Sequence, residues 1–343
     1  MADEILIVRG EEVVAALKGE EVRMMELVRD AYEAHLRGNT SLPPSSFLLF
    51  PRPGQERDRI IALPAYLGDG FDLAGIKWIS SFPHNLERGI ERASAALILN
   101  STETGRPLAL LESSVISATR TAASAALAAS VLHPDRDVSR CGLIGCGLIN
   151  HEITRFLLAV FPRLETLVVH DTDPERAARF GRECERLSPR LKTVVAASAA
   201  DVLADAALVS FATTAGTPHI HDLSMCPPGT TLLHVSLRDL APELILAADN
   251  VVDDVDHVCR ANTSVHLASM QTGSRDFIRC TLAEITSGAA EPRPHPERIT
   301  VFSPFGLGVL DLAVGQFAYT QVREAGGGVR VDSFFPRPWL DRD

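Results

Sequence analysis

An α/β fold is predicted by three observations in this 343-residue sequence. Short apolar runs alternate with helical patterns after Arg140, a glycine-rich turn follows the first of these runs, and a separate strand-rich segment precedes them. Strand–helix alternation is typical of a parallel sheet covered by helices on both faces. A chain of this length favours two domains. The sequence therefore predicts a doubly wound domain together with a second, strand-rich domain.

The composition limits the classes of protein. Apolar residues make up 46% and charged residues 22% of the chain, which is ordinary for a globular protein. The net charge of −11 argues against a nucleic-acid-binding protein, which needs a basic face. Without a run of 18 apolar residues or a signal-peptide pattern at the start, we expect no membrane-spanning helix. The six widely spaced cysteines favour reduced thiols and a cytoplasmic location.

The first third of the chain predicts a strand, a helix and a β region. ILIVRG (5–10) is strand-like, and the helical pattern that follows ends at Gly38 and Asn39, which suit a helix C-terminus. Between residues 45 and 112, five apolar runs separated by Pro, Gly and Asp predict antiparallel strands, with a turn at Thr104 and Gly105. The run VISATRTAASAALAAS (115–130) predicts a helix because alanine is the best helix former.

After Arg140 the pattern changes to strands and helices in alternation. CGLIGCGLIN (141–150) predicts a strand and a glycine turn, and a helical pattern follows. TLVVHDTD (166–173) predicts the next strand, and Pro174 suits the first turn of the next helix. Four more short apolar runs continue the alternation as far as residue 254. Residues 141–254 therefore predict a doubly wound nucleotide-binding domain.

The glycine turn carries the signal for a cofactor. Gly145 to Asn150 fits G-x-G-x-x-N, in which the first Gly permits a tight turn and the second lets a pyrophosphate approach the helix N-terminus. Asn150 stands where Gly or Ala is usual, which bears on how closely the helix packs on the strand. Asp171, with Asp173 as a second choice, ends the next strand and suits the ribose hydroxyls, so NAD is favoured over NADP. The alternative is a glycine-rich turn that binds no cofactor.

Longer blocks of the sequence resemble the ornithine cyclodeaminase/μ-crystallin family. The matching blocks are GIKWIS (75–80), ERASAALILN (91–100), TGRPLALLESSVISATRTAA (104–123), GLIGCGL (142–148), HDTDP (170–174) and ITVFSPFGLGVLD (299–311). DRIIALP, GIKWIS and ERAS are most similar to the branch that acts on N-(2-amino-2-carboxyethyl)-L-glutamate in siderophore and antibiotic biosynthesis. Carried to this chain, the resemblance implies a Rossmann-type NAD-binding domain (119–314) inserted in an α+β substrate-binding and oligomerisation domain (1–118 and 315–343). It also implies a homodimer.

The resemblance also implies roles for individual residues. Lys77 and Arg120 match the residues that hold the α-amino-acid group of the substrate, and Asp239 matches the catalytic carboxylate. Lys77 is also expected to be catalytic by polarising the substrate, while Asp239 moves the proton or activates water. The other residues implied for the substrate are Arg92, Arg52 and Phe305. The residues expected to bind the cofactor are Gly145, Gly147, Leu148, Ile149, Asp171, Thr213, Thr214, Ser236, Ser94 and Ser303. The family usually has an arginine in the strand before DRII, where this chain has Phe50 followed by Arg52.

Physical chemistry supports these roles and also supplies alternatives. An arginine such as Arg120 binds a carboxylate with two parallel hydrogen bonds, but Arg120 could instead form a structural ion pair with an acid such as Glu112. Strand alternation puts Lys77 on the face opposite Trp78, where the alternative is a solvated lysine. Asp239 follows an apolar strand, at the edge where open α/β sheets bind ligands, and its alternative is a turn or helix-capping residue.

Two other interpretations concern metals and the reaction. His219, His221 and Cys226 lack the paired spacing of a zinc site, so we predict no metal. The predicted reaction is NAD-dependent oxidation of N-(2-amino-2-carboxyethyl)-L-glutamate, followed by hydrolysis to L-2,3-diaminopropionate and 2-oxoglutarate. The alternatives are an ornithine cyclodeaminase that makes proline and ammonia, a reductase for ketimines or opine-like adducts, and a μ-crystallin-like binding protein. The presence of Lys77, Arg120 and Asp239 together favours an enzyme.

Overall fold

A computed structural model describes residues 4–55, 58–134, 137–337 and 339–341. The chain divides into two compact units, which are treated separately below. The first comprises Met1–Glu20, Ala34–Arg120 and Leu307–Asp343, and the second comprises Glu21–Glu33 and Thr121–Gly306. One unit contains a mixed sheet and the other a parallel sheet with helices between its strands, which confirms the predicted α/β class. The division into a substrate domain and a cofactor domain stays a prediction.

The first unit is built on a mixed sheet in the order β16-β1-β7-β6-β5-β4-β2, with β3 paired to β4. Its strands are β1 (Ile5–Val8), β2 (Thr40–Ser41), β3 (Ser46–Leu49), β4 (Arg59–Leu67), β5 (Leu73–Ser81), β6 (Ala93–Ser101), β7 (Pro107–Glu112) and β16 (Val329–Val331). The pairs from β3 to β7 are antiparallel, as the sequence predicts. Strand β1 adds to β7 in parallel, which the sequence analysis did not anticipate.

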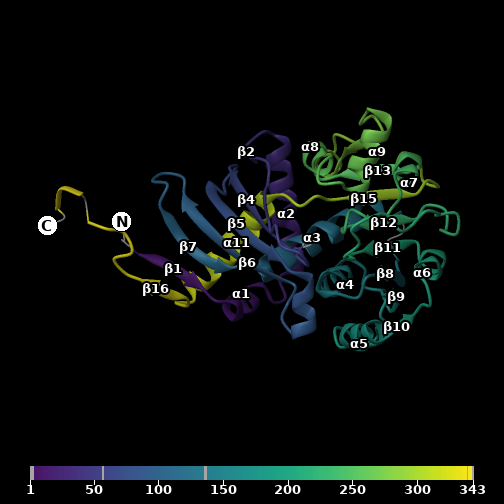
Figure 1. Ribbon diagram of the computed structural model, residues 1–343, viewed down its shortest axis with the longest axis horizontal. Coiled ribbons are helices and arrows are strands. Elements are labelled where there is room, and N and C mark those ends of the chain that lie inside the picture. Colours follow the sequence, from purple (N-terminus) through teal and green to yellow (C-terminus); the bar gives the residue numbers. More distant parts are fainter. Residues whose placement is uncertain (1–3, 56–57, 135–136, 338, 342–343) are drawn as a thin grey trace. The chain divides into compact units, whose positions relative to one another are not determined.

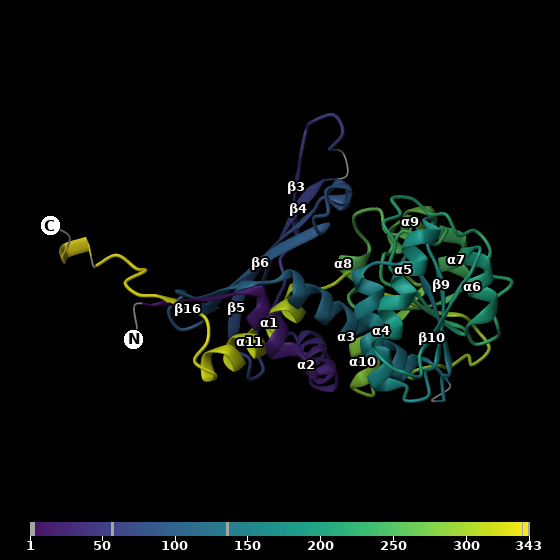
Figure 2. The same ribbon diagram turned by 90° about the horizontal axis from the view of Figure 1, so that it is seen from below.

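Helix α11 (Gly308–Glu324) covers one face of this sheet and runs along β4, β5 and β6 (Figures 1 and 2). The close approach depends on Gly315, because a Cβ added there would lie 2.3 Å from the side chain of Leu97. Along β5 the side chains alternate between the two faces. Lys77 is 1% exposed, whereas Trp78 is 45% exposed. Lys77 is therefore buried, and the alternative of a solvated lysine is wrong.

The second unit contains an eight-stranded sheet in the order β10-β9-β8-β11-β12-β15-β13-β14, and all its neighbouring strands are parallel. The strands are β8 (Arg140–Ile144), β9 (Thr166–His170), β10 (Lys192–Val195), β11 (Leu208–Phe211), β12 (Thr231–His234), β13 (Asp249–Val252), β14 (Ile278–Thr281) and β15 (Thr300–Ser303). The strand order reverses between β8 and β11. Open α/β sheets bind ligands at the carboxyl edge beside such a switch point.

Helices surround this parallel sheet (Figure 1). They include α4 (Leu148–Val160), α5 (Pro174–Glu185), α6 (Ala199–Asp205), α7 (Pro242–Ala247), α8 (Val255–Val258), α9 (Ser264–Thr272) and α10 (Leu282–Thr286). Helix α5 begins at Pro174, as predicted, because the side chain of Asp173 accepts hydrogen bonds from the next free backbone amides. The core includes fully buried aliphatic and aromatic side chains on the strands, among them Val209, Phe211 and Leu232, together with apolar side chains of the helices.

Three further helices lie in the described chain: α1 (Gly10–Leu17), α2 (Glu21–Leu36) and α3 (Ser114–Leu132). Helix α2 is followed by Gly38 with φ of +76°, as its sequence predicts. Among the helices of the described ranges, α3 has the length and apolar composition to cross a membrane, with a mean hydropathy of 1.4. However, 72% of that window is buried inside the protein. The core helix of a soluble protein passes the same test.

Candidate functional site

The glycine turn follows β8 at the switch point of the parallel sheet. Gly145 has φ of +91°, a conformation that side chains disfavour. A Cβ added to Gly145 would lie 2.5 Å from the carbonyl oxygen of Ala212, which follows the neighbouring strand β11. The amide of Gly145 donates to the carbonyl of His170 at the end of β9. The turn is therefore held between two strands, and only glycine fits its first position.

Gly147 differs from Gly145 because its surroundings are open. It is the N-cap of α4, its φ is −120°, and no atom lies within 4 Å of where its Cβ would be. The next side chain, Leu148, is 52% exposed, and Ile149 is half-buried. A helix N-terminus without a side-chain cap and with open space at its N-cap glycine, among the described residues, suits an anionic group that approaches the backbone. These residues fit the pyrophosphate of a dinucleotide.

Asn150 explains the departure from the usual glycine motif. Its side chain is fully buried, and its amide nitrogen donates to the carbonyls of Ile144, at 3.1 Å, and Gly145, at 2.7 Å. Its oxygen accepts a 2.7 Å hydrogen bond from Ser210 of β11. The larger residue thus fastens the helix to the turn and to the adjacent strand. A buried amide with this many partners is compatible with the packing of the motif.

The predicted ribose ligand, Asp171, lies directly after β9 and contacts the glycine turn. One of its oxygens accepts from the amide of Cys146 at 2.8 Å, and the other accepts from the amide of Asp173 at 3.0 Å. Each carboxylate oxygen has a second lone pair, so Asp171 can also accept from ribose hydroxyls. Asp173 instead caps helix α5. Of the two acids considered from the sequence, Asp171 is the better placed.

A second group of polar residues surrounds Asp239, which is fully buried in the loop after β12. Oδ1 accepts from Thr213 at 2.5 Å and lies 3.1 Å from Nε2 of His219, while Oδ2 accepts from Ser236. Nε2 of His234 lies 3.3 Å from Oδ2. The structure therefore brings together three predicted site residues: Thr213, Ser236 and Asp239. The alternative of a helix-capping Asp239 is wrong, because its carboxylate contacts side chains.

The proton of His234 is fixed by its partners. Nε2 accepts a 3.1 Å hydrogen bond from the backbone amide of Asp239, so this nitrogen carries no proton. Nδ1 lies 3.3 Å from Oγ of Ser303, within hydrogen-bonding distance. Ser303 was expected to bind the cofactor, but it is 1% exposed and supports His234. His234 is thus a buried support for the Asp239 loop.

The surroundings of Asp239 keep its carboxylate charged. Burial alone would raise the pKa of Asp239, but hydrogen bonds, the one from His219 foremost, outweigh it and hold the pKa below the ordinary range. The same loop contains Leu237 in the left-handed region, with φ of +68°. Strained backbone of this kind is maintained only where surrounding contacts enforce it. Asp239 is therefore a fixed negative charge rather than a group that titrates near neutral pH.

In the first unit, Lys77 and Arg120 share one buried acid, Asp311 of helix α11. Nζ of Lys77 lies 2.7 Å from Oδ2 of Asp311, and Nε of Arg120 lies 3.2 Å from Oδ1. Lys77 also donates to Ser117, at 3.1 Å. Sequence reasoning proposed Glu112 as the acid beside Arg120, but Glu112 accepts from the amides that begin α3. Two cations and one anion leave a net positive charge, which suits a further carboxylate.

The surroundings of Lys77 lower the pKa of its ammonium group. Burial is the main cause that lowers the pKa of its ammonium to about 8, and the charge of Arg120 lowers it further, whereas Asp311 opposes both. Near neutral pH Lys77 therefore carries a charge that it loses under mildly alkaline conditions. A lysine with a lowered pKa can bind an anion and also exchange a proton.

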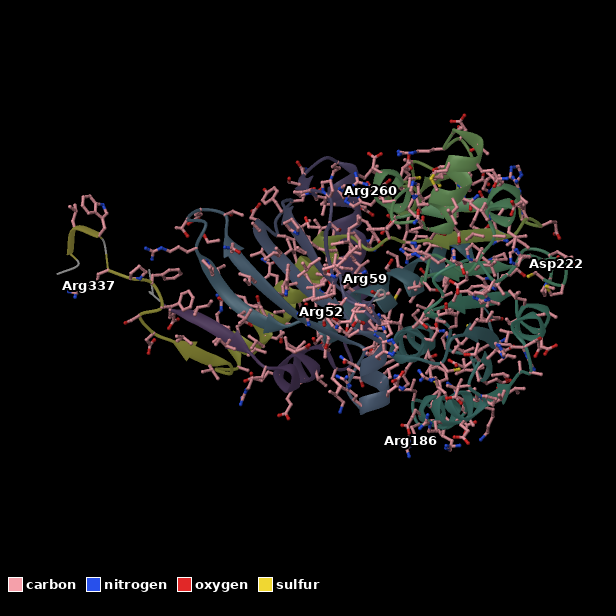
Figure 3. The ribbon with its side chains drawn as sticks, viewed as in Figure 1. Arg52, Arg59, Arg186, Asp222, Arg260 and Arg337 are labelled. Carbon is pink, nitrogen blue, oxygen red and sulfur yellow. The ribbon has the colours of Figure 1, made fainter. Side chains whose placement is uncertain are left out.

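Two of the remaining predicted substrate residues, Arg92 and Arg52, lie on the same unit but not in that cluster. Arg92 precedes β6, and its Nη1 donates to Oγ of Ser81 at 2.7 Å. Arg59, which sequence reasoning missed, is paired with Ser81 across β4 and β5. Its positive charge helps to lower the pKa of Arg92, although burial of Arg92 is the larger cause. Arg52 is exposed in the connection between β3 and β4 (Figure 3).

Four other residues that were considered from the sequence are described here one by one. Ser94 lies on β6 of the first unit, where its hydroxyl is 2.8 Å from that of Ser80. Phe305 donates its amide to the buried Asp253 at 2.8 Å. Thr214 is exposed after β11, and His221 is exposed in the same loop. The roles assigned to these residues stay predictions.

Metal ligands do not gather in any part of the chain that the structure describes. No group of three or more His, Cys, Asp or Glu side chains in these ranges could hold an ion. His219 contacts Asp239, and Cys226 is half-buried. All six cysteines are free thiols. Burial, and to a lesser degree Asp171, raises the pKa of Cys146 in the glycine turn to about 12.

The parallel sheet, the glycine turn at its switch point and the acid after β9 define a protein of the dinucleotide-binding α/β class. The chain belongs to the ornithine cyclodeaminase/mu-crystallin family, whose sequence model matches residues 11–326. The resemblance drawn from the sequence is therefore confirmed.

Relatives of known activity and structure match nearly the whole chain. N-((2S)-2-amino-2-carboxyethyl)-L-glutamate dehydrogenase of Staphylococcus aureus is 28% identical over 90% of this chain and 93% of its own. The structure of Thermococcus litoralis Δ1-pyrroline-2-carboxylate reductase with NADH and L-proline has a TM-score of 0.87 at 25% identity, and it covers 95% of this chain and 100% of its own. An archaeal alanine dehydrogenase dimer with bound NAD has a TM-score of 0.85 at 27% identity, over 97% and 100% of the two chains.

Proposed function

We propose that this protein is an NAD-dependent dehydrogenase that cleaves N-(2-amino-2-carboxyethyl)-L-glutamate to L-2,3-diaminopropionate and 2-oxoglutarate. The general class, an NAD-dependent enzyme that acts on small amino acids, follows from the family and from relatives solved with NADH and NAD. Gly145, Gly147 and Asp171 are the residues that would hold NAD. The specific substrate is inferred from the first unit and from the Staphylococcus aureus relative.

The observation that carries the substrate proposal is the distribution of cations along β5. Lys77 and Ser81 are four residues apart, so their side chains lie on one face of the sheet. Lys77 belongs to the cluster with Arg120, whereas Ser81 accepts from Arg92 and is paired with Arg59. At ~3.4 Å per residue, the two positions are about 14 Å apart along the strand. Two cationic groups at this separation suit a molecule with carboxylates at both ends.

The residues of the first unit have defined tasks in this reaction. Arg120, with its planar guanidinium, orients the carboxylate next to the reacting carbon. Lys77 contributes charge there and can take up the proton of the substrate amine when it is neutral. Arg92 and Arg59 bind a carboxylate remote from the reacting carbon. NAD, held by the glycine turn and Asp171, would supply the hydride acceptor for that carbon. Water then attacks the resulting carbon–nitrogen double bond, and the products separate.

The alternative functions require fewer cationic residues at the substrate site. An ornithine cyclodeaminase binds one carboxylate and a distal amine, for which Arg92 and Arg59 are unfavourable neighbours because of their charge. The same objection applies to a reductase for ketimines that carry a single carboxylate, the third enzymatic alternative, although not to one for opine-like adducts with several carboxylates. A binding protein has no need for a buried, charged Asp239 with four polar neighbours. We also propose a homodimer, as in the archaeal alanine dehydrogenase, with siderophore or antibiotic biosynthesis as the pathway and the cytoplasm as the location.

Arg92→Gln tests the substrate proposal, with Arg88→Gln as its matched control. Arg88 is exposed a few residues away in the same connection. Loss of a charged hydrogen-bond donor costs ~1.5–3 kcal/mol, so Arg92→Gln should raise KM for N-(2-amino-2-carboxyethyl)-L-glutamate about 10- to 100-fold. The affinity for NAD should not change, and Arg88→Gln should behave like the wild type. Equal KM values for the two variants would contradict the assignment of a second carboxylate site.

A further inference from the structure

The acid expected to bind the ribose of the cofactor, Asp171, has a cationic neighbour on the same unit. Asp171 follows β9, and Arg176 lies in the first turn of α5, which begins at Pro174. The side chain of Arg176 is 39% exposed, so its head group is accessible to a ligand. The structure links the two residues through Asp173, which lies between them in the chain.

Asp173 connects Arg176 with the ribose site. The backbone amide of Asp173 donates to Oδ1 of Asp171 at 3.0 Å, and Oδ2 of Asp171 accepts from the amide of Cys146 at 2.8 Å. The other link is an ion pair, in which Oδ2 of Asp173 lies 4.0 Å from Nε of Arg176. Burial raises the pKa of Cys146, and the charge of Arg176 acts in the opposite direction, an effect that weakens with distance. The guanidinium is therefore close to both Asp171 and the glycine turn.

The guanidinium of Arg176 has unused capacity to bind an anion. Its contact with Asp173 is longer than a hydrogen bond, and Oδ1 of Asp173 accepts from the backbone amides of Glu175 and Arg176. Within the described ranges, the side chain of Arg176 donates no hydrogen bond. Its N–H groups are therefore available, and an arginine in this state binds phosphate oxygens with two parallel hydrogen bonds.

NADP differs from NAD by a phosphate on the ribose hydroxyl that Asp171 is expected to bind. This phosphate would lie beside Asp171, between the end of β9 and the start of α5. The first free amides of α5 cannot receive it, because Asp173 already accepts from them. Neither the glycine turn (145–150) nor the residues after the neighbouring strand β10 (196–198) contain a lysine or arginine. Of these segments, only the start of α5 supplies a cation, and that cation is Arg176.

We propose that Arg176 is a second determinant of cofactor specificity, and that its guanidinium binds the 2′-phosphate of NADP. Asp171 disfavours NADP by repulsion, whereas Arg176 attracts the phosphate and so limits the preference for NAD. Because the acids Asp171, Asp173 and Glu175 outnumber this one cation, NAD stays the preferred cofactor. The inference goes beyond the proposed function, since it concerns the cofactor and does not depend on which amino acid is the substrate.

Arg176→Gln tests the proposal, with Arg182→Gln as the matched control, because Arg182 is exposed in the last turn of the same helix. Displacement of bound NADH by NAD or NADP, followed by NADH fluorescence, gives the ratio of Kd for NADP over Kd for NAD without turnover. Loss of the charged hydrogen bonds should raise this ratio about 10- to 100-fold in Arg176→Gln. Arg182→Gln should keep the wild-type ratio. Arg176→Lys should give an intermediate ratio, because lysine binds phosphate as a point charge.

The same measurement in an Asp171→Asn background gives an independent test. Removing the repulsion should lower the ratio, and adding Arg176→Gln should raise it again about 10- to 100-fold. Equal ratios with and without Arg176→Gln, in either background, would overturn the assignment. If Arg176→Gln lowers the melting temperature and weakens both cofactors equally, Arg176 serves only the fold and the inference is wrong. If the ratios change as expected but N-(2-amino-2-carboxyethyl)-L-glutamate does not react, the proposed function is wrong and the inference stands.

Discussion

Lys77 and Asp311 form a buried ion pair, with Nζ 2.7 Å from Oδ2 and side chains that are 1% and 0% exposed. The same carboxylate also pairs with Arg120. Breaking a buried pair by removing one partner is costly, because it leaves an unpaired buried charge. Asp311 thus keeps two cations in place before a substrate arrives. Their net positive charge is what we expect the carboxylate of the substrate to neutralise.

This arrangement predicts a pH dependence of substrate binding. The pKa of Lys77 is lowered to about 8, so its ammonium is charged below that pH and neutral above it. KM for the amino-acid substrate should therefore rise as the pH increases through 8. Lys77→Arg should abolish the rise, because arginine stays charged. Steady-state kinetics across this range measure it, and a KM that does not vary with pH in the wild type would contradict the assignment.

Asp311 and burial shift the pKa of Lys77 in opposite directions. Asp311 raises the pKa of Lys77, so Asp311→Asn should lower this pKa further. The rise in KM should then begin at a lower pH than in the wild type. Circular dichroism of the variant serves as the check on folding. A shift of the rise to higher pH would show that the charge of Asp311 is not what Lys77 senses.

Arg120→Lys separates a substrate ligand from a structural ion pair. Lysine keeps the charge opposite Asp311 but loses the planar fork that binds a carboxylate with two hydrogen bonds. A lost charged hydrogen bond of ~1.5–3 kcal/mol corresponds to KM about 10- to 100-fold higher, with unchanged NAD affinity. If KM is unchanged and the melting temperature falls, Arg120 serves only the fold.

Substitution by alanine should have different effects at the two glycines of the turn, Gly145 and Gly147. Gly145→Ala places a Cβ 2.5 Å from the carbonyl of Ala212, so both the free energy of unfolding and NAD affinity should fall. Gly147→Ala meets no atom within 4 Å, so stability should be unchanged while NAD affinity falls. Urea denaturation and NAD titration measure the two quantities. Normal NAD affinity in a stable Gly147→Ala variant would mean that the pyrophosphate does not approach this turn.

Asp171→Asn tests the choice of cofactor. Asparagine can still accept from the amide of Cys146, so the turn should keep its shape, but the charge that repels a 2′-phosphate is removed. The ratio of kcat/KM for NAD over NADP should fall about 10- to 100-fold, in line with one charged interaction of ~1.5–3 kcal/mol. Equal use of the two cofactors by the wild type would rule out Asp171 as the selecting residue.

Local signals in the sequence were sufficient to predict most strands of the second unit, its glycine turn and the start of helix α5. Gly145 needs a positive φ and Pro174 suits a helix start, so both positions could be recognised without knowledge of the fold. The alternation of apolar runs likewise predicted strands β8 to β13. It did not predict β15, which inserts between β12 and β13 although it is the last strand of this sheet along the chain. Strand order depends on packing between distant segments and has no local signal.

The parts of the site that sequence reasoning missed are long-range contacts. Asp311 lies on α11, far along the chain from Lys77 and Arg120, and its sequence context is an ordinary apolar helix. His219 was interpreted as a polar loop residue, because its contact with Asp239 depends on a bridge between two loops. Strand periodicity did place Lys77 and Trp78 on opposite faces correctly. It could not say which face α11 covers.

The central claim is tested most directly by incubating the purified protein with NAD and N-(2-amino-2-carboxyethyl)-L-glutamate and measuring all three products. We predict that NADH, 2-oxoglutarate and L-2,3-diaminopropionate accumulate in equal amounts. Ornithine under the same conditions should yield no proline. Conversion of ornithine to proline and ammonia without accumulation of NADH, together with no reaction of N-(2-amino-2-carboxyethyl)-L-glutamate, would contradict the proposed activity and establish a cyclodeaminase in its place.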